Sequence, residues 1–210
     1  RINVNALKDK NGQLNRPQID RLLKLIDLVN RRNADRERIS YGLVAALIDW
    51  IDADDDVTHL PFVSPDGRGA ESSYYEGLTP PYRCRNEWMD TIEELCWVKD
   101  MTPEGFDVLR EHLTTVGDGQ ININSAPVLV IQSLTEQMDS ALAQMIVRQR
   151  QRRPFASVTE LRSVPGMTDN IYLAIKDSVT VKPEERIYRV RALGSVHDRT
   201  CRIEAIMRRN

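Results

Sequence analysis

The sequence predicts an α+β protein in which a helical body made of two related units is inserted into a β-sheet domain. An internal repeat carries the first part of this prediction. Residues 2–6 return as 121–126, and residues 91–101 return as 157–167. Self-similarity of this kind indicates one structural unit present twice. Residues 178–210 instead alternate apolar and polar side chains, which is the period of a β-strand.

Apolar periodicity and turn residues give the expected elements in order. Pro17 suits the first turn of a helix. We expect an extended segment over 2–7, a turn over 9–12, helices over 16–29, 41–51, 89–95 and 103–113, a turn over 117–119, helices from 127 and over 140–150, 157–162 and 169–176, and strands over 178–181, 187–193 and 200–207. A turn over 194–199 makes the last two strands a hairpin.

These elements divide the chain into a β-domain formed by its two ends and a helical domain between them. The expected bounds are 1–7 for the first strand of the β-domain, 8–177 for the helical domain and 178–210 for the C-terminal strands. Within the helical domain, unit one covers 8–118 and unit two 119–177. Only unit one contains a long acidic loop, over 52–85, so this loop is the feature that distinguishes the two copies.

Composition excludes several classes of protein. The 210 residues are 41% hydrophobic, 29% charged and carry a net charge of −2. Without a basic excess, the chain has no overall field to attract nucleic acid or an anionic membrane. It has no run of about twenty apolar residues that would span a bilayer and no signal peptide. Because it opens directly on strand-like residues, we expect a trimmed part of a longer protein.

The acidic loop contains a candidate cation site. Asp52, Asp54 and Asp56 have the spacing that opens an EF-hand loop, but the glycine and glutamate that complete such a loop are absent. Carboxylates packed this densely repel one another, and a divalent cation removes the repulsion. Glu71, from the other end of the loop, could complete such a site. The alternative is a solvated acidic loop that follows a helix. Zinc is not expected, since no quartet of His and Cys exists.

Catalysis finds no support in the sequence. His59, His112 and His197 are scattered over three segments without a nucleophile motif, and no glycine-rich phosphate loop is present. A calcium-dependent hydrolase would need a nucleophile or a pair of acidic residues in a pocket, and the sequence indicates no candidate for either. We therefore expect that the protein is not an enzyme.

Unit two also resembles a helix-hairpin-helix module, which binds DNA phosphates through the backbone of a glycine-flanked hairpin. The supporting arginines are Arg148, Arg150, Arg152 and Arg153. The hairpin keeps Gly166 but has Thr168 where a second glycine would let the backbone approach a phosphate. Unit one has Asp100 and no glycine. A DNA-binding module is thus the alternative function, while our expectation is no binding to nucleic acid.

The order of all these features resembles the K-type minor pseudopilin of bacterial type II secretion systems, the general secretion pathway protein K family. The residues that carry the likeness are 2–5 (INVN), 49–52 (DWID) running into the acidic loop, 69–71 (GAE) followed by Tyr74 and Tyr75, 121–127 (ININSAP), and the closing hairpin. The likeness covers nearly the whole chain. Asp100 departs from it, because the family often has glycine there.

The resemblance implies a pilin-like antiparallel β-sheet domain with a large inserted α-helical domain made of two helix-hairpin-helix or SAM-like units. This chain would be the periplasmic part of a protein anchored in the inner membrane by an N-terminal hydrophobic helix. It would sit at the tip of the pseudopilus with I-type and J-type minor pseudopilins, prevent further subunits from adding, and thereby support protein export. Contact with secreted substrates or the outer-membrane secretin is a further hypothesis that follows from the resemblance.

The resemblance also implies Ca²⁺ in the acidic loop. The expected ligands are Asp52, Asp54, Asp56 and Glu71, with Ser72 through its carbonyl oxygen, and Asp55 and Asp66 as alternatives.

The cysteine spacing by itself leaves open a Cys84–Cys96 disulfide or two free thiols. The resemblance favours the disulfide, which would limit the movement of the loop. Cys201 lies on a predicted strand beside Ile203, and we expect it to be a buried thiol.

Overall fold

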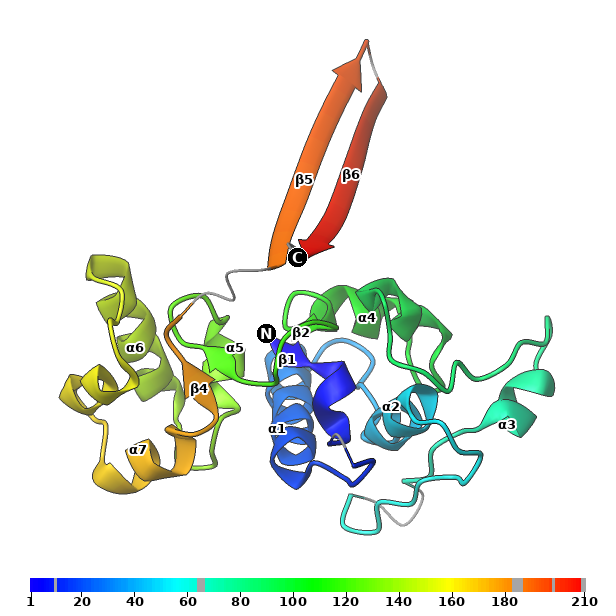
Figure 1. Cartoon of the computed structure of the whole chain (residues 1–210), viewed down its shortest axis with the longest axis horizontal. Coiled ribbons are helices and arrows are strands. Elements are labelled where there is room, and N and C mark those ends of the chain that lie inside the picture. The colour runs from blue at the N-terminus through cyan, green and yellow to red at the C-terminus, as the bar shows by residue number, and fades with distance from the viewer. Residues whose placement is uncertain (10, 64–66, 183–186, 198, 209–210) are drawn as a thin grey trace.

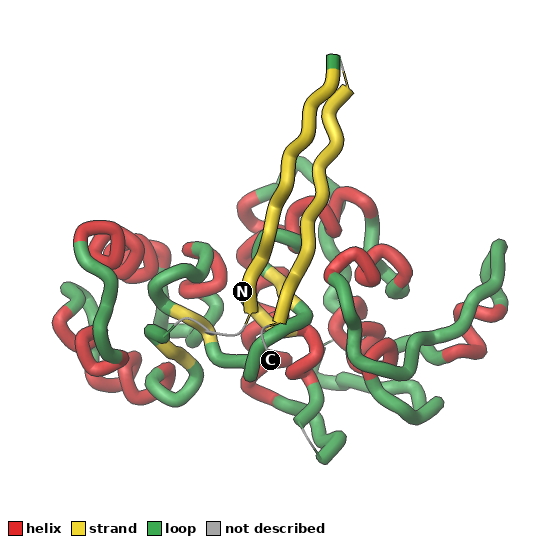
Figure 2. The backbone as a smooth tube through the Cα atoms, turned by 45° about the horizontal axis from the view of Figure 1, so that its top comes forward, coloured by secondary structure: helices red, strands yellow, loops and turns green. Residues whose placement is uncertain are grey.

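The structure, a computed structural model, describes residues 1–9, 11–63, 67–182, 187–197 and 199–208. A helical body lies beneath a β-hairpin that extends away from it (Figure 1). The view in Figure 2, turned by 45°, shows the same projection of the hairpin. The predicted α+β class is confirmed.

Unit one begins with a short strand and contains both α-helices and 3₁₀ helices, which are labelled η. Its elements are β1 (Ile2–Asn3), η1 (Val4–Leu7), α1 (Arg16–Arg32), α2 (Gly42–Ile51), α3 (Ser72–Glu76), η2 (Ile92–Trp97), α4 (Pro103–Leu109) and β2 (Leu113–Thr114). Unit two contains β3 (Ile121–Asn122), α5 (Val128–Gln132), α6 (Ser140–Arg152), η3 (Val158–Ser163), α7 (Asp169–Ile175) and β4 (Val179–Thr180). The hairpin is β5 (Ile187–Val196) and β6 (Arg199–Arg208).

Strand pairing repeats from one unit to the other. In unit one, β1 runs parallel to β2, with Ile2 opposite Leu113. In unit two, β3 runs parallel to β4, with Ile121 opposite Val179. Each unit is thus closed by a short parallel pair that joins its first and last residues, and the sequence repeat corresponds to a repeat in the structure.

The second asparagine of the repeated Ile-Asn-x-Asn motif explains why the motif recurs. Asn5 donates from Nδ2 to the carbonyls of Met89 (2.9 Å) and Thr115 (2.8 Å), and its Oδ1 accepts from the Met89 N–H (2.9 Å). In unit two, Asn124 donates to the carbonyls of Phe155 (2.9 Å) and Val181 (3.1 Å) and accepts from the Phe155 N–H (2.9 Å). One amide side chain therefore satisfies three backbone groups at the same place in each unit.

The two units are held together through α1. This helix packs against α5, and its polar side chains bond to the connection between the units. Gln18 donates to the Gly119 carbonyl (2.6 Å), and Arg21 donates to the Gln18 amide oxygen (2.8 Å). Both side chains are buried. Gly119 has φ +88°, and a Cβ there would lie 2.6 Å from the Gln18 amide nitrogen, so the close approach requires glycine.

Two expected boundaries of the β-domain are wrong. Residues 1–7 do not supply a strand to the C-terminal sheet, because β1 pairs with β2 and residues 4–7 form η1 in the helical body. Their side chains explain this, since Ile2 and Val4 are fully buried there. Residues 179–180 likewise pair with β3 in unit two. Among the described residues, the C-terminal sheet consists of β5 and β6 alone.

The hairpin has one apolar face. Paired residues of an antiparallel ladder share a face, and the pairs Val190–Ala205 and Ala192–Ile203 are both apolar. Ile203 is 62% exposed and Met207 54%. Cys201, expected to be buried, lies on the same face and is exposed. The described part of the chain therefore leaves this face uncovered.

Within the described ranges, none of the helices combines the length and the apolar composition needed to cross a membrane.

We predict that Asn5→Ala lowers the free energy of unfolding by about 2–4 kcal/mol, because it leaves three buried backbone groups without partners. Urea unfolding followed by circular dichroism measures this. Asn11→Ala, which changes an exposed side chain, serves as the control. A loss from Asn5→Ala below about 0.5 kcal/mol, the size of an ordinary surface effect, would contradict the role given to this side chain.

Candidate cation site

The site begins on α2, a helix whose ten residues are all buried. Asp49 lies in its last turn and is 0% exposed, and Asp52 follows its C-terminus and is 7% exposed. Residues three apart on a helix lie on neighbouring positions of one face. The sequence thus places two carboxylates side by side at the buried end of an apolar helix.

The acidic loop returns to this point and adds a third carboxylate. The Thr58 N–H donates to Asp49 Oδ1 (2.9 Å), and the Gly69 N–H donates to the Thr58 carbonyl (2.9 Å). The chain therefore folds back on itself and brings Glu71, the residue before α3, next to α2. A Cβ on Gly69 would lie 2.0 Å from Asp49 Oδ2, so no other residue fits at that position.

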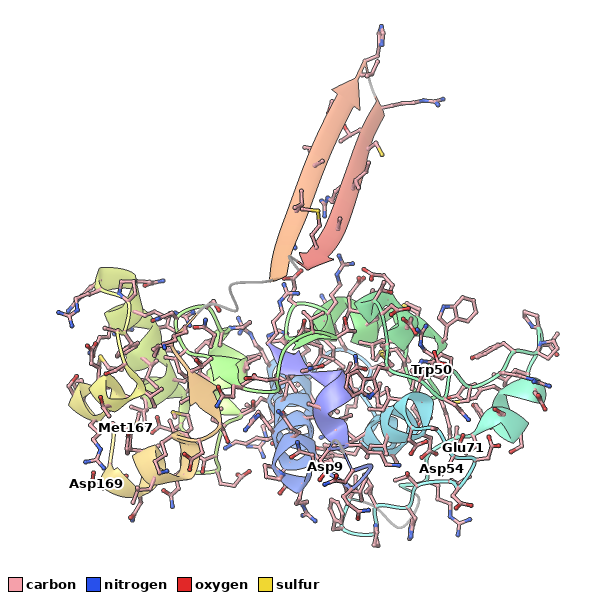
Figure 3. All side chains as sticks on the ribbon, in the orientation of Figure 1. Asp9, Trp50, Asp54, Glu71, Met167 and Asp169 are labelled. Carbon is pink, nitrogen blue, oxygen red and sulfur yellow. The ribbon has the colours of Figure 1, made fainter. Side chains whose placement is uncertain are left out.

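Asp49, Asp52 and Glu71 form a buried carboxylate cluster. One carboxylate oxygen from each lies within 4.8 Å of the other two. Asp49 Oδ2, Asp52 Oδ1 and both Glu71 oxygens are buried without a hydrogen-bond partner. Figure 3 labels Glu71 in the region between α2 and α3, with Asp54 nearby. Unpaired buried carboxylates are strongly destabilising when ionised. A positive charge bound between these three would therefore stabilise the fold.

Burial raises the pKa values of all three carboxyl groups. Loss of solvent, followed by the negative charges of Asp49 and Asp52, raises the pKa of Glu71 to about 8. Burial also raises the pKa of Asp49 and of Asp52, in the second case against the opposing effect of Lys8. In the absence of a bound cation, Glu71 therefore holds at neutral pH a proton that an ordinary glutamate would release.

Lys8 is a basic residue in contact with the cluster. Its Nζ lies 2.5 Å from Asp52 Oδ2 and 3.6 Å from Asp54 Oδ2. The Lys8 backbone is held by a bridge to Leu14 directly after η1, and its side chain is 18% exposed. A segment far away in the sequence thus reaches the acidic loop through one ammonium group.

Only part of the ligand set expected from the sequence comes together. Asp52 and Glu71 do, whereas Asp54 and Asp56 are exposed, and Asp54 Oδ1 accepts a bond from the Asp56 N–H (3.0 Å). Ser72 begins α3 beside Glu71 and lines an open cavity of about 470 Å³ together with Asp55. Asp66 lies outside the described residues.

Sequence reasoning missed Asp49 and Lys8. Asp49 could have been found from the sequence, because it is the one charged residue within the apolar run of residues 42–51. Lys8 could not have been found in this way, since no local sequence pattern links it to the acidic loop.

The donor set fits Ca²⁺. All three buried side chains offer hard carboxylate oxygens, four of which lack partners, and Ca²⁺ takes oxygen ligands in flexible geometry. Glu71 also lines the open cavity beside α3.

An aromatic cluster lies against the site. Trp50, which follows Asp49 in the chain, contacts Tyr75 edge to face, with ring centroids 5.2 Å apart, and Tyr75 packs on Tyr82 at 5.2 Å. Tyr75 is fully buried. Burial is the largest cause of the raised pKa of Tyr75, and the Asp49 charge contributes to it.

The disulfide expected between Cys84 and Cys96 is not formed in the structure, where both thiols are free. The Cys84 thiol is buried and donates to the Asp49 carbonyl (3.4 Å), and Cys96 is exposed. Burial raises the pKa of Cys84 to about 12, so this thiol is unreactive at neutral pH.

The hairpins of the helix-hairpin-helix-like units differ between the copies. Gly166 has φ +90° in unit two, and Asp100 occupies the corresponding position in unit one with φ +66°. The Asp100 carboxylate accepts a bond from Ser40 (3.4 Å). A fixed carboxylate at this position repels phosphate, so the DNA-binding alternative gains no support from the geometry.

Fold and site together define an α+β protein with a helical body that contains two short parallel strand pairs, a projecting hairpin and a buried carboxylate cluster. Two family models, both described as "Type II secretion system (T2SS), protein K", match residues 1–118 and 121–182. The chain therefore belongs to the type II secretion system protein K family.

Individual relatives agree with this assignment. The type II secretion system protein K of Aeromonas hydrophila is 34% identical over 82 residues, covering 39% of this chain and 23% of the relative. That of Pseudomonas aeruginosa strain PAO1 is 30% identical over 145 residues, covering 67% and 41%. The chain thus spans less than half the length of either relative.

A solved structure shows the same fold. The crystal structure of the GspK-GspI-GspJ complex from enterotoxigenic Escherichia coli matches with a TM-score of 0.72 at 20% identity, over 100% of this chain and 71% of the matched chain.

We predict that, in chelator, the free energy of unfolding falls as the pH rises from about 4.5 towards about 8. The folded state keeps a proton on Glu71 over this interval, which the unfolded chain has released. The stabilising contribution is complete below the unfolded pKa and is lost as the pH passes the folded one. Urea unfolding at pH 5 and pH 8 measures the slope.

Glu71→Gln should reduce this pH dependence, because glutamine does not ionise, while Glu87→Gln, at an exposed position, should leave it unchanged. Equal slopes for the wild type and Glu71→Gln would show that Glu71 titrates normally.

Proposed function

We propose that this protein is a minor pseudopilin that caps the tip of the type II secretion pseudopilus and assembles with I-type and J-type minor pseudopilins to support protein export. Membership of the protein K family supports this proposal most directly. The fold likeness to a chain of a GspK-GspI-GspJ complex is consistent with it. The role is mechanical: the helical body supplies bulk at the tip, and catalysis is no part of it.

The projecting hairpin supports a pilin-like sheet. A two-stranded hairpin is marginally stable alone in water, and this one exposes an apolar face that includes Val190 and Ile203. The N-terminus lies near the base of the hairpin in both ribbon views (Figures 1 and 2). We propose that pseudopilin-domain residues outside the 210 cover this face, among them a hydrophobic helix that anchors the periplasmic part in the inner membrane.

In this function, Ca²⁺ would fix the acidic loop against the helical body. Asp49, Asp52 and Glu71 would hold the ion. The sequence also suggests Asp54, Asp56 and the Ser72 carbonyl as ligands, but the exposure of Asp54 and Asp56 favours a site built on the buried three. The ion supplies positive charge that offsets carboxylate repulsion. The chain's own contribution is to bury the three carboxylates against α2 and to bring Glu71 back through the close approach at Gly69.

Assembly is tested by co-expressing the full-length protein with the I-type and J-type minor pseudopilins of the same bacterium. Co-elution of all three in size-exclusion chromatography is expected. Ile203→Asp should abolish it, because a charge buried on the apolar hairpin face would disrupt the pseudopilin domain that the complex requires. Leu193→Asp is the matched control, since Leu193 is 70% exposed and pairs with Arg202 on the opposite face. Absence of a wild-type complex would contradict the proposal, and equal effects of the two variants would contradict the assignment of the faces.

We predict that Ca²⁺ raises the unfolding midpoint of the chelator-treated protein. An ion that binds only the folded state stabilises it by about 2.7 kcal/mol at a hundredfold excess over Kd. Asp49→Asn and Glu71→Gln should remove this shift, and Asp20→Asn, on the exposed side of α1, should keep it. Differential scanning calorimetry measures all four proteins.

In the same experiment, Asp56→Asn distinguishes the two ligand sets. A calcium response that survives Asp56→Asn is expected for a site built on the buried cluster. A response lost in Asp56→Asn but kept in Glu71→Gln would place the ion on the exposed loop instead.

A further inference from the structure

The charges of the buried cluster do not balance within the chain. Asp49, Asp52 and Glu71 bring three carboxylates together, and Lys8 contributes one ammonium group at 2.5 Å from Asp52. When these four buried groups are ionised, their net charge is −2. The Asp54 carboxylate, 3.6 Å from the same ammonium, is not counted because its side chain is 55% exposed and its charge is screened by solvent. One divalent cation would therefore make the desolvated group neutral, whereas a trivalent ion would leave an excess positive charge.

Lys8 is placed to act as a permanent member of this site. Its backbone is tied to Leu14, and the Asn15 N–H donates to the Leu7 carbonyl (2.8 Å), so the segment that carries it is fixed to the start of α1. The Asp52 side chain that it contacts is 4% exposed. Screening by solvent is weak at such a position, so the ammonium acts strongly on any ion bound beside Asp52.

We propose that Lys8 sets the charge selectivity of the site: its fixed positive charge beside Asp52 matches the buried cluster to one divalent ion and disfavours trivalent ions. Lys8 is a specificity-determining residue in this role and does not itself coordinate the ion. The inference rests on the proposed cation site and adds to it a reason why a lysine from another segment reaches the acidic loop.

The physical basis is the dependence of Coulomb energy on ion charge. Repulsion between Lys8 and a bound ion grows in proportion to the charge of that ion. Removing the ammonium therefore strengthens the binding of Tb³⁺ more than that of Ca²⁺, whatever happens to the absolute affinities. A role of Lys8 confined to holding Asp52 in place would change both affinities together and leave their ratio unaltered.

The experiment measures Tb³⁺ binding by luminescence sensitised through the aromatic residues beside the site, and Ca²⁺ binding by competition. In Lys8→Met, the ratio of the Tb³⁺ to the Ca²⁺ association constant should rise at least about tenfold, as expected for one additional unit of ion charge a few ångströms from a partly screened ammonium. Lys8→Gln is measured alongside it in case methionine packs poorly.

Two control variants isolate the charge. Lys8→Arg keeps the positive charge and should keep the wild-type ratio. Lys24→Met removes another largely buried lysine, paired with Glu136 at 3.6 Å, and should also leave the ratio unchanged. An unchanged or lower ratio in both Lys8→Met and Lys8→Gln would overturn the proposed role of Lys8 alone. If the wild type bound neither ion, the cation site itself would be wrong, and this inference with it.

Discussion

The buried carboxylates of Asp49, Asp52 and Glu71 are the constraint on which the acidic half of unit one depends. The first two are fixed by α2, which is apolar on every side and is buried throughout. The third arrives only because the loop folds back through Thr58 and Gly69. Four oxygens left without partners mean that this fold is favourable only when protons or a cation offset the repulsion. In the proposed cation site, the local fold and cation binding would therefore be coupled.

Elsewhere in the helical body, hydrogen bonds from side chains satisfy buried polar groups. In each unit, one asparagine side chain satisfies three backbone groups of a distant segment, Asn5 at Met89 and Thr115 in the first copy. These bonds let irregular connections pack inside a small helical unit. The acidic loop departs from this repeated arrangement, and among the described residues the buried carboxylate cluster lies in unit one. The hairpin, by contrast, exposes apolar surface and so points to partners outside the described chain.

Much of the fold was predictable from the sequence, because the repeat, the apolar periodicity and the terminal alternation all report local structure. The prediction failed where pairing was decided over long distances. The sequence of residues 2–3 is compatible with a strand in the C-terminal sheet and equally with one in the helical body. Their burial and their pairing with β2 place them in the helical body. The site was likewise predictable only in part. Asp52 and Glu71 could be predicted because they lie in an acidic segment, whereas Lys8 reaches the loop through tertiary packing that no local pattern encodes.

The most direct test of this account is the anomalous signal of calcium in crystals of the protein grown with Ca²⁺ and measured at long wavelength. The account predicts an ion within about 2.3–2.6 Å of carboxylate oxygens from Asp49, Asp52 and Glu71, with the Lys8 ammonium still beside Asp52. No ion at this position, or an ion held only by the exposed carboxylates of Asp54 and Asp56 while Glu71 stays without a ligand, would contradict it.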